Sequence, residues 1–208
     1  MNELNCRLLG TGEAFVYAFA DAEDAEALRA LLPDCTLIAM GVADWNGQLS
    51  PWPAPAIFRG QSDFAGGGEA LLYEICDRLI PEIESGRAVK RRIIAGYSMA
   101  GLFSLYAVSR RECFSCAVSA SGSVWYEGFI DFLRASKHAP ERAYLSVGDR
   151  ERLSRNRAFR QIEENTRLVE QILRAKGSKT IFELNPGGHF ERPVERLARG
   201  IRWALQQY

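Results

Sequence analysis

The sequence predicts a single-domain α/β protein with a mostly parallel sheet of about six strands and helices on both faces. Short apolar runs rich in β-branched residues alternate along the chain with longer segments of helical period, which is the pattern of such a sheet. With 208 residues, 47% of them hydrophobic and 25% charged, the chain can bury one core without a metal or disulfide. No internal repeat, low-complexity tract or hinge-like linker divides it.

Six short runs of strand-forming residues define the expected sheet. In chain order they are A-F-V-Y-A-F-A (14–20), C-T-L-I-A-M-G-V (35–42), R-R-I-I-A-G (91–96), C-A-V-S-A (116–120), A-Y-L-S-V-G (143–148) and T-I-F-E-L (180–184). Each is short, apolar and followed by polar or small residues, as expected for strands buried on both faces.

The segments between these runs have helical period. Helices are expected at about 22–32, 67–85, 99–110, 128–136, 155–176 and 191–206. The segment 155–176 has the clearest pattern, with apolar residues on one face and two Glu–Arg pairs four residues apart on the other. Gly177 is placed to end that helix, and its charges are interpreted as a solvated face.

One long irregular stretch, residues 43–65, contains three prolines and two tryptophans. Loops of this length inside a compact domain are usually functional. Trp45 and Trp52 would line a cleft if the loop borders a site, or pin the loop to the body of the protein. The sequence leaves both interpretations open.

Charge and cysteine content restrict the partners and the compartment. Lys plus Arg (26) equals Asp plus Glu (26), so no net field attracts a nucleic acid or an anionic membrane. We expect a small-molecule substrate as partner, no nucleic acid and no membrane, and a homodimer is compatible with the sequence.

The five cysteines show neither a disulfide nor a zinc pattern. Their number is odd and their spacing irregular, which favours free thiols in a reducing compartment. Cys113 and Cys116 form a C-x-x-C, but no second pair or nearby histidine completes a zinc set. The N-terminus lacks an export-signal pattern and no run approaches about 20 apolar residues, so a cytoplasmic location is expected.

The segment R-R-I-I-A-G-Y-S-M-A-G-L-F-S-L-Y-A (91–107) is the strongest chemical signal. A β-branched strand, a turn of small residues around Ser98 and a helix together predict a nucleophile elbow, in which a sharp bend exposes the serine hydroxyl. Gly96 and Ala100 flank the serine, and Gly101 allows the helix to approach the sheet closely. The N–H of Met99, at the start of that helix, is expected to donate to an oxyanion.

A serine nucleophile needs a general base, and the chain has two histidines. His189 follows the last strand in N-P-G-G-H-F, at the same sheet edge as Ser98, because parallel strands all end there. His138 precedes a strand at the opposite edge and is interpreted as a solvated residue. We therefore expect His189 to be the base.

The acid of a triad should lie between serine and histidine in the chain. Asp149 and Glu151 both follow the strand that ends at Gly148. Glu151 is preferred, because an acid three residues beyond a strand-ending glycine fits the turn geometry. Asp149 remains the alternative, and the acid not used would bond backbone N–H groups of the turn.

The second oxyanion donor is expected from the loop after the first strand, at about Phe19–Asp21, with Ala20 chosen as the donor. Asp21 and Asp24 also fit a helix N-cap with an acidic first turn. This second interpretation needs no catalytic role for the loop.

These motifs resemble the esterase branch of the α/β-hydrolases, which includes esterase D-like, feruloyl and enterobactin esterases. The similarity rests on G-Y-S-M-A-G, S-A-S-G-S-V-W-Y, G-D-R-E and G-G-H-F and extends from about residue 15 to the C-terminus. It implies a minimal α/β-hydrolase fold over residues 1–208 without a cap domain. It also implies carboxylic ester hydrolysis through an acyl-enzyme on Ser98, with His189 as base and then acid, and no metal or organic cofactor.

The sequence departs from the family pattern in having Glu where many relatives have Asp, and Ala100 where many have Gly. No motif identifies the ester. The residues expected to line the cleft are Trp45, Asn46, Trp52, Asp63 and Trp125. An acyltransferase or peptidase on the same triad, and a non-catalytic binding module with this fold, are the alternatives to a serine carboxylesterase.

Overall fold

Seven strands form the central sheet in the order β1-β3-β2-β6-β7-β8-β9. The computed structural model describes residues 4–57 and 60–206. Within this range the strands of that sheet are β1 (Asn5–Leu9), β2 (Ala14–Phe19), β3 (Thr36–Gly41), β6 (Arg91–Tyr97), β7 (Cys116–Ala120), β8 (Arg142–Gly148) and β9 (Lys179–Asn185). All neighbours pair in parallel except β1, which runs antiparallel to β3.

The six predicted strands are confirmed as β2, β3 and β6 to β9, and β1 is an additional strand. All five residues of its sequence, N-C-R-L-L, are exposed or half-buried, as expected at a sheet edge. It therefore lacks the continuous apolar run by which the other strands are recognised.

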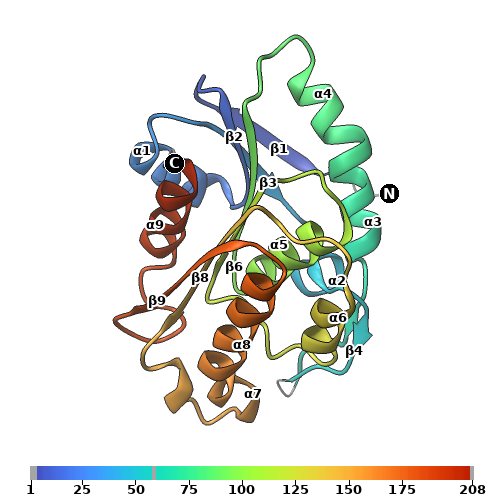
Figure 1. Ribbon diagram of the computed structural model, residues 1–208, viewed down its shortest axis with the longest axis vertical. Helices are drawn as coiled ribbons and strands as arrows, with labels where there is room; N and C mark the ends of the chain where they lie inside the picture. Colours follow the sequence, from blue (N-terminus) through green and yellow to red (C-terminus); the bar gives the residue numbers. More distant parts are fainter. Residues whose placement is uncertain (1–3, 58–59, 207–208) are drawn as a thin grey trace.

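Helices cover both faces of the sheet, as predicted (Figure 1). Helices α1 (Ala22–Leu31) and α9 (Pro193–Leu205) lie together on one face, where they enclose one buried cluster with the strands. The other face carries α3 (Gly68–Tyr73), η1 (Glu74–Leu79), α4 (Ile80–Glu84), α5 (Met99–Arg110), α6 (Phe129–Ala135) and α8 (Ile162–Ala175). The result is a three-layer α/β single domain.

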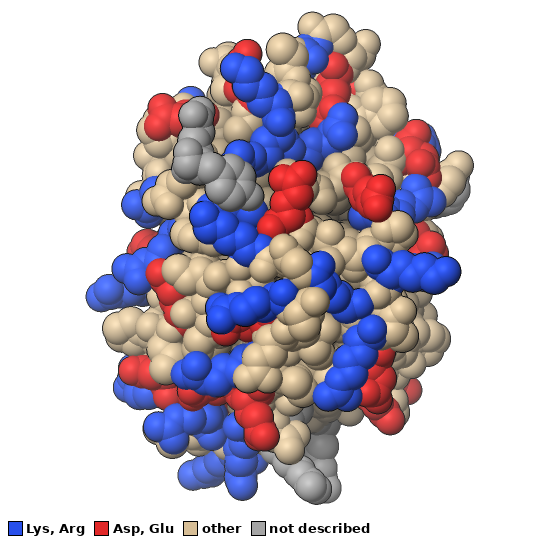
Figure 2. Space-filling view, in the orientation of Figure 1, with Lys and Arg blue, Asp and Glu red and all other residues tan. Residues whose placement is uncertain are grey.

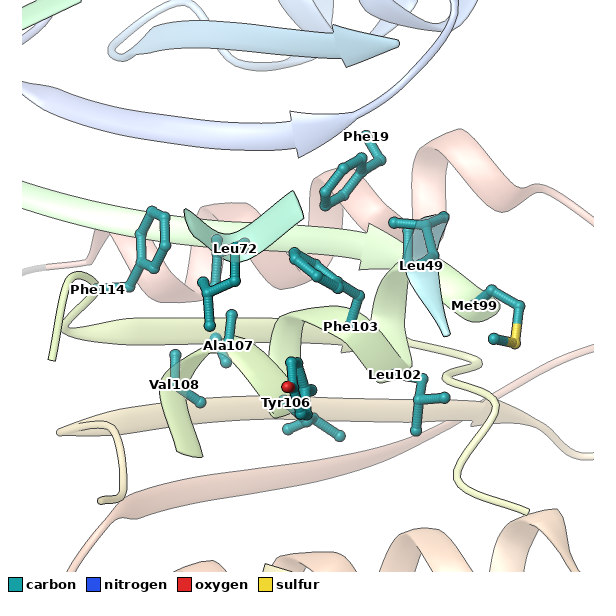
Figure 3. Close-up of a cluster of buried hydrophobic side chains, with 14 of the residues drawn as sticks. Phe19, Leu49, Leu72, Met99, Leu102, Phe103, Tyr106, Ala107, Val108 and Phe114 are labelled. Carbon is teal, nitrogen blue, oxygen red and sulfur yellow. The ribbon is translucent and has the colours of Figure 1, made fainter. Parts of the chain in front are cut away.

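Helix α5 forms the centre of the larger core. Its residues are buried from Met99 to Ser109, and Figure 3 shows their side chains among those of β2, α2 and α3. The rings of Phe103 and Phe19 meet edge to face with centroids 5.3 Å apart, an arrangement that stabilises aromatic pairs. Burial on this scale fixes the helix whose first residue adjoins Ser98.

Two predicted helices and the long loop are more irregular than the sequence suggested. The segment predicted at 67–85 contains the π-helical turn η1, which is followed by Pro81 at the start of α4. Residues 155–176 are divided into α7 (Arg157–Arg160) and α8, and η2 (Glu151–Leu153) precedes them. The loop 43–65 contains helix α2 (Trp45–Leu49) and a small hairpin of β4 (Pro53–Ala54) and β5 (Phe64–Ala65).

The connections place a crevice at the carboxyl ends of β2 and β6. From β2 the chain passes through α1 to β3, whereas from β6 it passes through α5, on the opposite face, to β7. The strand order therefore reverses between β2 and β6, and ligands bind at such switch points in open α/β sheets. Ser98 follows β6 directly.

All five cysteines are free thiols, and Cys35, Cys76 and Cys116 are buried. Burial raises the pKa of Cys35 to about 11 and that of Cys116 to about 12, so these thiols stay protonated at neutral pH. Across residues 4–57 and 60–206, every helix falls short of the length and apolar character needed to cross a bilayer.

Candidate active site

Ser98 occupies a strained bend between β6 and α5. Its φ of 57° and ψ of −121° lie in a region that residues other than glycine rarely adopt. The Ser98 N–H donates to Ala120 O at 3.1 Å, which holds the bend against β7. This is the strand-turn-helix geometry predicted for the elbow.

Small residues make this bend sterically feasible. A Cβ at Gly96 would lie 2.3 Å from the carbonyl carbon of Ala100, and one at Gly101 would lie 2.9 Å from Gly122 Cα. Both distances are far below van der Waals contact, so the helix could not start where it does with larger residues.

The structure brings Ser98, His189 and Glu151 together in one hydrogen-bonded series. His189 Nε2 lies 3.0 Å from Ser98 Oγ, and His189 Nδ1 lies 2.8 Å from Glu151 Oε2. The histidine comes from the loop after β9 and the glutamate from η2 after β8. The imidazole is therefore positioned between an alcohol and a carboxylate.

The Glu151 carboxylate is fully enclosed. Its side chain is 0% exposed, and its Oε1 accepts from Gly148 N at 2.7 Å and from Ser121 Oγ at 2.6 Å. Burial alone would raise the pKa of Glu151, but hydrogen bonds from His189 and Ser121 outweigh it and lower the pKa to about 2. Glu151 is thus a carboxylate throughout the neutral pH range.

Asp149, the alternative acid, bonds the backbone instead. Its Oδ1 accepts from Gly187 N at 2.9 Å, while Arg150 N donates to Gly187 O at 3.1 Å and Asp149 N to Asn185 O at 2.8 Å. The turn after β8 is thereby tied to the histidine loop, as expected for the acid that does not face the imidazole.

His138 lies far from Ser98, at the amino-terminal edge of the sheet just before β8. Its Nδ1 lies 3.0 Å from Glu112 Oε1, and its side chain is 40% exposed. The interpretation as a solvated residue fits this position.

The two predicted oxyanion donors differ in their availability. Met99 is the first residue of α5, so its N–H has no partner within the helix and faces the bend. The choice of Ala20 is corrected, because its N–H donates to Met40 O at 3.2 Å as an extension of the β2–β3 ladder. The next amide, that of Asp21, donates to none of the described residues, and the Asp21 side chain caps α1 by accepting from Asp24 N at 2.9 Å.

A cavity of about 330 Å³ opens beside Ser98 between α1 and α9. Its walls are mostly apolar, and its charged residues among those described are Asp21 and Asp24. Burial, together with the nearby carboxylates of Asp21 and Glu23, raises the pKa of Asp24. Trp45, predicted to line the cleft, lies on this cavity, whereas Asn46 is not among its lining residues.

The other predicted cleft residues, Trp52, Asp63 and Trp125, make contacts outside this cavity. Trp52 Nε1 donates to Glu127 O at 3.0 Å, and Asp63 Oδ1 accepts from Ala56 N at 2.9 Å. Trp125 packs against the ring of Phe159, centroids 5.9 Å apart. None of Trp52, Asp63 and Trp125 is among the residues that line the cavity beside Ser98, so the expectation is corrected for this cavity. Trp52 joins the loop to the segment before α6, Asp63 bonds within the loop, and Trp125 packs against α7.

A second hollow, of about 370 Å³, lies on the other side of the imidazole and includes Leu153, Phe159, His189 and Phe190 in its lining. Phe159 and Phe190 each meet the His189 ring edge to face, with centroids 5.1 Å apart. Phe190 is 88% exposed and Leu153 is 66% exposed. This half of the site is therefore an open apolar shelf.

Besides the aromatic residues of the shelf, the sequence did not reveal three polar residues that bond this series. Arg196 and Ser121 donate to the Glu151 carboxylate, and Tyr97 OH donates to the His189 carbonyl oxygen. Ser121 has a positive φ of 46°, but no sequence pattern marks that conformation. Arg196 lies in the amphipathic helix α9, where an arginine is normally solvated.

No cluster of three or more metal-ligating side chains occurs in the part of the chain that the structure describes.

Comparison with known proteins identifies one family. The family model Esterase, described as "Putative esterase", matches residues 12–193. The uncharacterized protein YbbA of Bacillus subtilis is 31% identical over 153 residues, which are 70% of this chain and 61% of that protein. The chain thus spans less than two thirds of this relative.

Solved structures with the same fold include several hydrolases. The siderophore hydrolase EstA from Aspergillus nidulans matches with a TM-score of 0.74 at 20% identity, covering 94% of this chain and 83% of its own. An IroE-like serine hydrolase from Shewanella oneidensis matches with a TM-score of 0.77 at 15% identity, covering 97% and 79%. At these identities the likeness is one of fold.

Proposed function

Since the chain belongs to the esterase family, we propose that it is a serine hydrolase that cleaves carboxylic esters through an acyl-enzyme on Ser98. The observation that carries the proposal is the series Ser98 Oγ, His189 and Glu151, with distances of 3.0 Å and 2.8 Å. Such a series lets a neutral imidazole remove the serine proton as the oxygen attacks a carbonyl carbon.

In the first half of the reaction, Ser98 Oγ bonds to the carbonyl carbon while its proton moves to His189 Nε2. The carbonyl oxygen becomes an oxyanion, which accepts from the Met99 N–H and, we propose, from the Asp21 N–H. Glu151 holds Nδ1 of the imidazole and stabilises its positive charge. Collapse of the intermediate breaks the bond to the alcohol oxygen, which takes the proton from Nε2.

In the second half, water replaces the alcohol. His189 takes a proton from the water while the water oxygen attacks the acyl carbon. The bond between that carbon and Ser98 Oγ then breaks, and Ser98 Oγ takes the proton back from His189. The carboxylic acid then leaves, and the enzyme returns to its starting state.

The two hollows suggest how a substrate is divided. His189 Nε2 protonates the leaving alcohol, and we propose that the apolar part of this alcohol extends past the imidazole onto the shelf of Phe190 and Leu153. The acyl group then enters the cavity beside Ser98, in which the charged residues are Asp21 and Asp24. Two carboxylates there disfavour an acyl chain with its own negative charge, so the proposed substrate has an acyl group that carries no negative charge.

Activity-based labelling tests the function directly. Wild-type protein should hydrolyse p-nitrophenyl acetate and form a covalent adduct with a fluorophosphonate at Ser98, located by peptide mass spectrometry. Ser98→Ala should lose the adduct, and both Ser98→Ala and His189→Ala should lower kcat by roughly 10³-fold or more. His138→Ala is the matched control and should behave as wild type. Equal labelling of the Ser98→Ala variant would refute the proposal.

A further inference from the structure

Behind the triad lies a buried arginine that the reaction described above does not use. Arg196, on α9, is 4% exposed. A buried guanidinium is costly unless its charge is paired and its hydrogens are satisfied, so its partners indicate why it is there.

The guanidinium directs both terminal nitrogens toward the site. Its Nη2 donates to Glu151 Oε1 at 2.9 Å and also to Ser121 Oγ, and its Nη1 donates to Tyr97 OH at 2.8 Å and to Gly188 O at 3.1 Å. The remaining Nε is buried and has no partner among the described residues. An arginine placed only to stabilise α9 would not direct both terminal nitrogens at these loops.

These partners are the structural elements that carry the triad. Tyr97 ends β6 immediately before Ser98, Ser121 follows β7, Glu151 follows β8, and Gly188 precedes His189. Tyr97 OH in turn donates to His189 O at 2.6 Å. One side chain thus joins four loops that are distant in sequence.

We propose that Arg196 is a positioning residue of the active site, which fixes Glu151 and the histidine loop and offsets the charge of Glu151. The proposal rests on the esterase function proposed above. Because Arg196 occupies Oε1, only Oε2 is left for His189 Nδ1. Because its positive charge lies beside that carboxylate, it opposes protonation of the imidazole, which must be neutral to accept the serine proton.

Other groups around the imidazole do not duplicate this charge. Ser98 and the rings of Tyr97, Phe159 and Phe190 contact it. None of them is charged at neutral pH, since burial raises the pKa of Tyr97 to about 12. Of the charged residues in the adjoining loop and turn, Arg150 pairs with Glu191 at 2.6 Å and Asp149 bonds Gly187 N. Asp21 and Asp24 line the cavity on the far side of Ser98, where their negative charge acts in the opposite sense to Arg196.

The pH dependence of hydrolysis separates this role from a purely structural one. In Arg196→Met, Glu151 attracts a proton to His189 more strongly, so the acid limb of the kcat/KM profile should move to higher pH by about one pH unit. The plateau at alkaline pH should also fall by about tenfold through lost positioning, with KM little changed. Arg196→Lys keeps the charge without the fork, so its acid limb should stay near that of wild type while its plateau falls. Arg199→Met, on the exposed side of the same helix, should match wild type in both.

Two results would overturn the proposal. One is an acid limb in Arg196→Met that coincides with that of wild type. The other, decisive if the methionine variant does not fold, is an Arg196→Lys variant with an unchanged plateau. Thermal unfolding of every variant separates loss of fold from loss of activity.

A measurement without catalysis distinguishes failure of this proposal from failure of the function. The chain has two histidines, so the His189 ring can be followed by NMR during a pH titration, with His138→Ala to assign it. Its protonation midpoint should be higher in Arg196→Met than in wild type even if no ester is hydrolysed. An unchanged midpoint would count against the proposal, whereas an inactive wild-type protein with a shifted midpoint would count only against the esterase function.

Discussion

At the scale of single residues, Phe190 is the most conspicuous surface feature of the site. Its side chain is 88% exposed, yet it adjoins the imidazole, with ring centroids 5.1 Å apart. Exposed aromatic side chains beside a reactive group commonly recognise an apolar ligand. In the proposed reaction this ring lies where the alcohol half of the ester leaves.

Phe190→Ser should therefore alter specificity and not the chemical step. Loss of an aromatic contact of some tens of Å² should cost about 1 kcal/mol, which lowers kcat/KM for a benzyl ester by about fivefold through KM. The methyl ester of the same acid should be hydrolysed as by wild type. Tyr73→Ser, another exposed aromatic residue outside both hollows, is the control. A proportional loss on both esters would assign Phe190 to loop structure instead.

At the scale of elements, the sequence predicts those parts of the fold and the site that depend on a local pattern of residues. The β-branched strand, small residues and helix around Ser98 are contiguous, and the end of a parallel strand fixes the sheet edge at which His189 and Glu151 lie. The role of Arg196 depends on four segments, distant in sequence, that meet beside α9, which no local pattern encodes. The Ala20 amide is used by the β2–β3 ladder, a pairing that sequence alone does not define to the residue.

The coupling between the turn after β8 and the histidine loop is a property of two elements together. Asp149 Oδ1 holds Gly187 N, and Gly187 O accepts from Arg150 N. Asp149→Ala removes the side-chain bond and should loosen the loop that presents His189. We expect kcat to fall about tenfold with KM unchanged, and the free energy of unfolding to fall by about 1 kcal/mol.

The matched control is Asp34→Ala, at an exposed turn near the amino-terminal edge of the sheet, which should leave both quantities unchanged. Steady-state kinetics and urea unfolding measure the two effects. A loss of stability without a loss of kcat in Asp149→Ala would show that the histidine loop keeps its catalytic position without the bond from Gly187 N to Asp149 Oδ1.

At the scale of the whole molecule, charge is mixed and not segregated. The formal net charge is zero, and Figure 2 shows basic and acidic side chains interspersed over one face. Several surface ion pairs, such as that of Arg167 with Glu163 on α8, contribute little to stability because solvent screens them. The response of the fold to acid should therefore depend mainly on buried charges.

Glu151 is the buried charge with the largest expected effect. Its pKa is lowered from an ordinary value of 4.5 to about 2 in the folded protein. A lowered folded-state pKa adds stability that is fully present above about pH 4.5 and is lost as the pH falls toward 2. The shift corresponds to about 3 kcal/mol.

Glu151→Gln should accordingly be less stable than wild type at neutral pH, and the difference should shrink as the pH is lowered. Urea unfolding at about pH 7, 5 and 3 measures this difference in the free energy of unfolding. The comparison requires that the slope of this free energy against urea concentration is the same in both proteins. Asp131 is the control, because its side chain is 83% exposed. The free energy of unfolding of Asp131→Asn should differ from that of wild type by the same small amount at all three pH values. A constant difference between Glu151→Gln and wild type from pH 7 to pH 3 would mean that the carboxylate is no better stabilised in the folded state than in the unfolded chain. In that case the hydrogen bonds from His189, Ser121 and Arg196 would only compensate for the cost of burying its charge.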